Sequence, residues 1–131
     1  MNTRDIYEIA GEDFEPVKRR LASEEFIGII IEKFAEDGTF SALAAAIKKQ
    51  DVSSAFRAAH TLKGVASNLG FSALAAAASD LTEILRGGSF MGADEAFIKV
   101  KAAYDKVIGA INAAKKSVIK LLFCVVSFVT D

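Results

Sequence analysis

Apolar residues recur every three or four positions along most of this 131-residue chain, which is the spacing of one face of an amphipathic helix. The spacing predicts four long helical segments with short connections between them, over residues 23–49, 51–69, 72–86 and 93–114. No segment alternates apolar and polar residues as a strand does until the very end of the chain. The predicted fold class is therefore all-α, an antiparallel up-and-down four-helix bundle.

A shorter pattern precedes these segments. Apolar residues between positions 6 and 10 predict a short helix that ends at Gly11. Asp13 is placed to cap a second short helix, with Pro16 in its first turn, where proline is tolerated. We expect this additional N-terminal part to lie across one end of the bundle.

The ends of the long segments carry residues that commonly cap or terminate helices: Ser23, Asp51 or Ser53, Gly70 and Ser72. The pair Asp37-Gly38 either bends or breaks the first long segment, and the pattern leaves both readings open. The inward face of that segment is predicted to carry its apolar stripe, which consists of Phe26, Ile27, Ile30, Ile31 and Phe34.

The only histidine of the chain, His60, lies in the second long segment. Helical spacing places His60 in one row with Lys63, Gly64 and Ser67. A second row, roughly opposite, is apolar and is predicted to face the core: Phe56, Ala59, Leu62, Ala66 and Leu69. The imidazole is therefore expected to point outward, with the positive charge of Lys63 one turn away and suited to a phosphate oxygen.

Gly64 is the least expected residue of this row. A glycine in the middle of a helix costs about 0.5–1 kcal/mol relative to alanine, and this chain uses alanine freely elsewhere. We infer that the space beside the imidazole is needed. A lone histidine among apolar residues is, on spacing alone, more often structural than functional, so the whole pattern has to be considered.

The stretch Ala59-His60-Thr61-Leu62-Lys63-Gly64, followed by Gly70 and Leu74, resembles the signature of histidine phosphotransfer (HPt) domains of bacterial phosphorelays. The resemblance is tight over these residues and looser over the helical layout from about residue 13 to residue 114. It implies a covalent phosphoryl carrier that accepts the group from a receiver-domain aspartyl phosphate and passes it to another receiver.

The resemblance also implies roles for single residues. His60 would be phosphorylated, most readily at Nε2, while Lys63 would steady the added negative charge and Gly64 would let the receiver approach. Ser67 and Asn68 would contribute hydrogen bonds to the phosphate or to a loop of the partner. A neutral imidazole has a pKa of about 6.5 and can attack phosphorus without a strong base to activate it.

The partners implied by the resemblance are the receiver domains of a response regulator or of a hybrid histidine kinase. Magnesium and most catalytic groups would belong to the receiver, so this chain itself needs no cofactor. No phosphate-cradling loop or kinase-like nucleotide motif is present in the sequence, and the chain is expected to be a carrier and not an autonomous enzyme.

One departure from the family concerns the other ring nitrogen. Some relatives, especially in chemotaxis kinases, hold it with a glutamate of the next helix, and here Thr82 occupies that position with Glu83 beside it. This weakens the case for direct phosphorylation by a kinase's ATP domain and leaves the relay function intact. The alternative function is an adaptor that binds a receiver or kinase without accepting phosphate.

Composition and charge exclude several other classes of protein. The net charge of −1 lacks the basic excess of a nucleic-acid binder, and Lys18-Arg19-Arg20 is expected to be a solvated face. One cysteine allows no internal disulfide, and with one histidine it leaves no zinc-type ligand cluster. The start of the chain has no apolar signal-peptide run, so a cytoplasmic location is expected. The initiator methionine favours a free-standing protein over a piece of a hybrid kinase.

The last residues differ in composition from the rest. Ten of the twelve residues from Val118 to Val129 are apolar, but a spanning helix needs about 20 such residues, so no spanning membrane segment is expected. We predict a domain over residues 1–116 and an apolar C-terminal tail over residues 117–131. The tail is either an extension of the last helix or an appended segment, and self-association through it is the alternative to a monomer.

Overall fold

The computed structural model describes the backbone of residues 2–130 and the side chains of residues 2–115. The described backbone is all-helical, as predicted, and contains no strand. Its seven helices are α1 (Thr3–Ala10), α2 (Glu15–Leu21), α3 (Glu24–Glu36), α4 (Thr39–Lys49), α5 (Val52–Asn68), α6 (Ser72–Arg86) and α7 (Ala93–Thr130).

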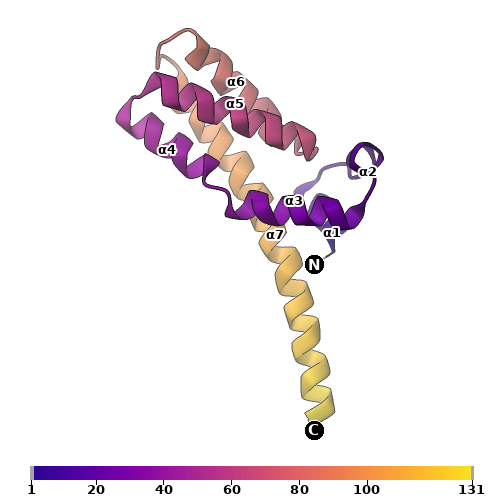
Figure 1. Ribbon diagram of the computed structural model, residues 1–131. Helices are drawn as coiled ribbons and strands as arrows, with labels where there is room; N and C mark the ends of the chain where they lie inside the picture. Colours follow the sequence, from indigo (N-terminus) through magenta and orange to yellow (C-terminus); the bar gives the residue numbers. More distant parts are fainter. Residues whose placement is uncertain (1, 131) are drawn as a thin grey trace.

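The bundle consists of α4, α5, α6 and the first part of α7, and each of these helices contacts the next in the chain (Figure 1). Successive helices run in opposite directions, which agrees with the predicted up-and-down arrangement. The helices α1, α2 and α3 gather at one end of the bundle, where α1 contacts α7 and α3 (Figure 1). The last part of α7 continues beyond the bundle.

The first predicted segment is two helices. After α3 ends at Glu36, Asp37 is extended with a ψ of 139°, and α4 starts at Thr39 on a different axis (Figure 1). The hydroxyl of Thr39 donates a hydrogen bond to the carboxylate of Asp37 at 2.6 Å, which fixes the break. The sequence had left a bend and a break equally open.

Several predicted caps are present. The hydroxyl of Ser23 accepts a hydrogen bond from the amide of Phe26 at 3.2 Å, and the carboxylate of Asp51 accepts one from the amide of Ser54 at 3.1 Å. Asp51, and not Ser53, is therefore the cap of α5. Hydrogen bonds from the hydroxyl and the amide of Ser54 favour the charged carboxylate and lower the pKa of Asp51.

Two predicted caps are displaced by one residue. The N-cap of α2 is Phe14, while the carboxylate of Asp13 accepts a hydrogen bond from the amide of Glu15 at 3.1 Å. Ser72 is the first residue of α6 and not its cap, because the fully buried Phe71 occupies the N-cap position.

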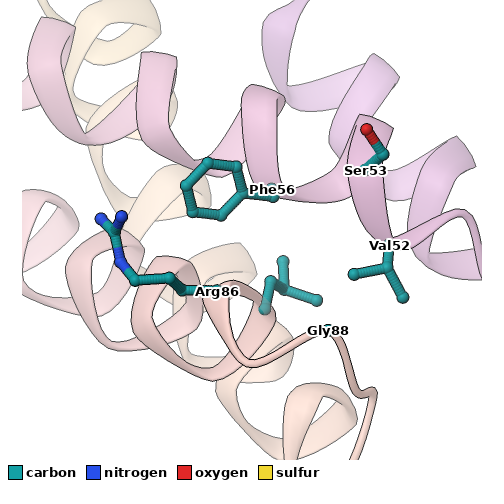
Figure 2. A pocket seen from close by; sticks show the side chains of 6 residues that line it. Val52, Ser53, Phe56, Arg86 and Gly88 are labelled. Atoms are coloured by element: carbon teal, nitrogen blue, oxygen red, sulfur yellow. The ribbon is translucent and has the colours of Figure 1, made fainter.

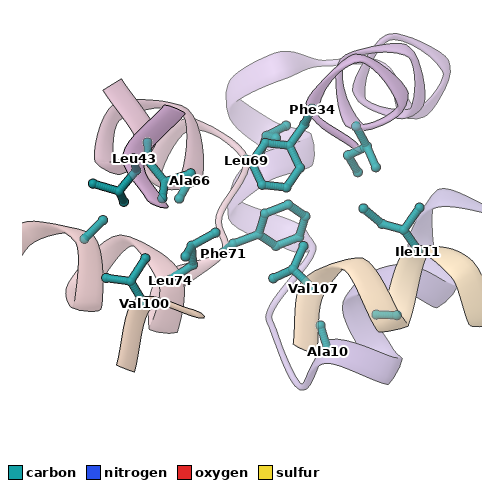
Figure 3. Close-up of a cluster of buried hydrophobic side chains, with 14 of the residues drawn as sticks. Ala10, Phe34, Leu43, Ala66, Leu69, Phe71, Leu74, Val100, Val107 and Ile111 are labelled. Carbon is teal, nitrogen blue, oxygen red and sulfur yellow. The ribbon is translucent and has the colours of Figure 1, made fainter. Parts of the chain in front are cut away.

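The core joins the bundle to the N-terminal helices around Phe71 (Figure 3). The Phe71 ring lies 5.2 Å from the ring of Tyr7 and 5.9 Å from the ring of Phe34, within the range of favourable aromatic pairs. The prediction that Phe26 faces the core is wrong. Its side chain is 49% exposed, because the buried row of α3 is Ile27, Ile31 and Phe34, and Phe26 is turned about 100° away from that row.

Within the part of the chain that the structure describes, no helix combines the length and apolar character needed to cross a membrane. The backbone of the predicted tail continues α7 as far as Thr130. The side chains of the tail lie outside the described residues, so the domain boundary near residue 116 stays a prediction.

Candidate functional site

Helix α5 turns one face to the core and another to solvent. The buried face carries a row of small and branched residues at a spacing of four and three: Ala55, Ala59, Leu62, Ala66 and, just after the helix, Leu69. The row of residues that begins at His60 lies on another face of the helix, away from the core. His60, Gly64, Ser67 and Asn68 are exposed, and Lys63 is half-buried.

The imidazole of His60 has one described aromatic neighbour. The ring of Phe56 lies nearly parallel to it, at a centroid distance of 6.1 Å and an interplanar angle of 12°. Among the hydrogen bonds of the described residues, none involves His60. The histidine is thus exposed and is contacted from one side by an aromatic ring.

Phe56 was predicted to belong to the core row, but it is only half-buried and packs against the edge of the core. Residue 56 lies four positions before His60, which places it on the same face of the helix one turn earlier. The core position of that turn is Ala55, which is fully buried, whereas Phe56 is half-buried. The sequence alone indicates this placement, because Phe56 and His60 are four positions apart and so share a helix face.

Lys63 and Gly64 lie one turn after the histidine. Lys63 takes part in none of the salt bridges formed by the described side chains, so its ammonium group is not neutralised by a carboxylate there. A Cβ added to Gly64 would meet no atom within 4 Å. The fold itself therefore has no packing reason for glycine at position 64.

Ser67 and Asn68 lie at the C-terminal end of α5, seven and eight residues after His60. At a rise of about 1.5 Å per residue, this places them roughly 10–12 Å along the helix axis from the histidine. The structure does not bring these two residues together with the imidazole.

Thr82, at the position where some relatives hold a ring nitrogen, lies on α6 and is completely buried. Its hydroxyl donates a hydrogen bond of 2.6 Å to the carbonyl oxygen of Ala78, one turn earlier in the same helix. The Thr82 side chain is thus a satisfied core residue.

Arg86 is a neighbour that the sequence analysis did not single out. Its guanidinium carbon lies 5.1 Å from the centroid of the Phe56 ring, and its nitrogens bind the carboxylate of Glu83 at 3.2 and 3.3 Å. A shallow recess opens beside this pair, between the start of α5 and the end of α6 (Figure 2). It is lined by Val52, Ser53, Phe56, Leu85, Arg86 and Gly88.

Among the described residues, no group of three or more histidine, cysteine, aspartate or glutamate side chains is placed to hold a metal ion. The groups that the site presents are an exposed imidazole and a lysine one turn away.

Comparison with known proteins agrees with the resemblance drawn from the signature. Residues 29–110 match the family model described as the Hpt domain. The matched region contains α4, α5 and α6 entirely, most of α3 and the first part of α7, and it leaves α1 and α2 outside. No curated protein and no solved structure matches the chain.

Proposed function

The chain belongs to the Hpt domain family, and from this premise we propose that it is a cytoplasmic phosphorelay carrier phosphorylated on His60. The group would come from an aspartyl phosphate on one receiver domain and pass to the aspartate of another. The observation that carries the proposal is the exposure of the only histidine on the outward face of α5, in the family's signature.

The reaction would proceed by direct displacement at phosphorus. The lone pair of Nε2 forms the N–P bond while the P–O bond to the receiver's aspartate breaks, and the electron pair leaves with that carboxylate. A neutral imidazole carries this lone pair already, so no proton has to be removed first. In the second step, the aspartate of another receiver attacks phosphorus and the imidazole is the leaving group.

The residues after His60 would support this transfer. The Lys63 ammonium group, which has no carboxylate partner among the described side chains, would attract the phosphoryl oxygens. The open space at Gly64 would admit the edge of the receiver's active site. We propose that the chain supplies no cofactor, and that magnesium is held by the receiver.

The experiment that tests this function is phosphoryl transfer from several magnesium-bound, pre-phosphorylated receiver domains to the chain and to its His60→Gln variant. We expect acid-labile, base-stable label on the wild type and none on the variant, because an amide side chain has no nucleophilic ring nitrogen. Circular dichroism of the variant serves as the control, since an exposed side chain contributes little to the fold.

A folded wild-type chain that takes no label from any receiver would instead favour the adaptor function. Equal labelling of the wild type and of His60→Gln would assign the phosphoryl group to a different residue.

A further inference from the structure

We propose that Phe56 is the positioning residue of His60, and that Arg86, held by Glu83, keeps Phe56 in place. The stacked ring would restrict the imidazole to one orientation before a receiver docks. This inference rests on the proposed function, because it concerns how His60 is prepared for transfer.

The need for such a residue comes from the exposure of His60. An exposed side chain exchanges among staggered rotamers, and in the described part of the structure no hydrogen bond fixes the His60 ring. Some relatives hold a ring nitrogen with a glutamate at the position of Thr82. The Thr82 hydroxyl instead donates a hydrogen bond to the carbonyl oxygen of Ala78. In-line attack on phosphorus requires a defined ring direction, so a freely turning imidazole would react in only a fraction of encounters.

Phe56 has the geometry to supply this restriction. Its ring and the imidazole differ by 12° in orientation, and their centroid distance of 6.1 Å falls within the range of stacked pairs. Stacking fixes the plane of the imidazole while it occupies neither nitrogen. The negative face of the phenyl ring also favours the positive charge that the imidazole gains as a nitrogen bonds to phosphorus.

Phe56 is restrained in turn from the neighbouring helix. The guanidinium carbon of Arg86 lies 5.1 Å from its centroid, within the reach of a cation–π contact, and Figure 2 shows Arg86 extended along the side of the Phe56 ring. Two hydrogen bonds from Arg86 to the Glu83 carboxylate orient that guanidinium. A continuous row from Glu83 through Arg86 and Phe56 to His60 thus joins α6 to the acceptor face of α5.

The test compares Phe56→Leu, which keeps an apolar side chain of similar volume, with Phe56→Tyr, which keeps the ring. The control is Phe97→Leu, because Phe97 stacks on Phe40 with similar geometry, at 5.8 Å and 13°, away from the histidine. Two measurements are made on the full chain. One is the NMR shifts of the His60 ring protons, and the other is single-turnover transfer from a phosphorylated receiver, which gives a maximal rate constant (kcat) and a half-saturating concentration (KM).

We expect Phe56→Leu to remove the ring-current displacement of the His60 protons and to lower kcat about three- to tenfold at an unchanged KM. Phe56→Tyr should restore both quantities, and Phe97→Leu should leave both at the wild-type values. Arg86→Gln should shift the His60 signals in the same direction by a smaller amount, and it provides a second variant if Phe56→Leu folds poorly.

Unchanged His60 shifts and unchanged kcat in Phe56→Leu would overturn the inference. A raised KM at a constant kcat would also overturn it, since Phe56 would then be a docking contact. The NMR measurement does not depend on transfer. A wild-type chain that takes no phosphoryl label would count against the proposed function, and the NMR shifts would still decide whether Phe56 positions His60.

Discussion

The middle of helix α5 and its C-terminal end differ sharply in how the rest of the molecule contacts them. Around His60 the helix is exposed, and the described contact of the imidazole is one stacked ring. At its C-terminal end, the carbonyl oxygen of Leu69 accepts a hydrogen bond of 2.6 Å from the buried hydroxyl of Tyr7. Arg20 of α2 donates to the carbonyl oxygens of Ser67 and Asn68 at 3.1 and 2.5 Å.

The turn that follows is held from the same side. The carboxylate of Glu12 accepts a hydrogen bond from the amide of Ser72, so a residue from the α1–α2 connection caps the start of α6. Val17 packs against Gly70, which has a left-handed φ of 72°. Carbonyl and amide groups that a helix end leaves unpaired are thereby satisfied by tertiary partners.

The contrast teaches that stability and chemistry are separated along one helix. Residues of α1, α2 and their connection hold the hairpin turn between α5 and α6. The face around His60 is exposed and does not contribute to holding that turn. We therefore expect substitutions at the turn to change the free energy of unfolding, and substitutions at the open face to change transfer.

The largest expected effect is at the turn. Gly70→Ala would force a residue with a Cβ into the left-handed region, and that Cβ would overlap the side chain of Val17. The two penalties together should lower the free energy of unfolding by about 2–4 kcal/mol, measured by urea denaturation.

The matched control is Gly88→Ala, where φ is 78° and no atom lies within 4 Å of an added Cβ. Only the backbone penalty of about 1–2 kcal/mol applies there. Equal losses in the two variants would mean that the contact between Val17 and the turn contributes nothing.

A smaller loss is expected from Tyr7→Phe. The variant leaves the carbonyl oxygen of Leu69 without its hydrogen-bond donor in the core, which should cost about 1–2 kcal/mol of unfolding free energy at neutral pH. Thermal or urea denaturation measures the loss, and transfer by the folded variant should remain at the wild-type rate.

The effect of Tyr7→Phe on the free energy of unfolding should also depend on pH. Burial raises the pKa of Tyr7 above its ordinary value of about 10, so the folded chain keeps this proton when the unfolded chain has lost it. The stability that the protonated Tyr7 gives to the folded chain is complete below pH ~10. It is lost as the pH rises further, by up to about 1.4 kcal/mol per pH unit. Tyr7→Phe should not show this loss of stability at high pH. Burial also raises the pKa of Tyr104, but Tyr104 is present in both proteins, so its effect drops out of the comparison.

The smallest effect on stability is expected at the open face, where the effect on transfer is large. Gly64→Gln should raise the free energy of unfolding by roughly 0.5 kcal/mol, since glutamine is the better helix former and the site is open. Transfer from a receiver should fall at least about tenfold, if steric access is what the glycine provides.

Gly109→Gln is the control for this substitution. Gly109 lies in α7, is exposed, and also has no atom within 4 Å of an added Cβ. It should gain the same stability without any change in transfer. Normal transfer by Gly64→Gln would remove the steric explanation for the glycine.

The local part of this architecture could be predicted from the sequence, because it depends on neighbours along the chain. The helical spacing indicated α5, α6 and the first part of α7, and Ser23, Asp51 and Gly70 were recognised by the chemistry of helix ends. The position of His60 on the outward face followed from the apolar row beside it.

The rest depends on residues that meet only in the folded chain. Arg20 is exposed, as predicted, but it also caps the end of α5, 47 and 48 positions away in sequence, which no local pattern indicates. Glu12 replaces the expected Ser72 cap across 60 positions. The proximity of Arg86 to Phe56 requires the register of the α5–α6 hairpin, which no local pattern specifies.

The support that α1 and α2 give to the hairpin turn has a consequence for protein engineering. The matched family region begins at residue 29, but Tyr7, Glu12 and Arg20 all precede it. A chimera that imports only residues 29–110 would therefore acquire His60 without the groups that close its hairpin. A unit that keeps these groups should start no later than Asn2, whose side chain caps the first of the supporting helices.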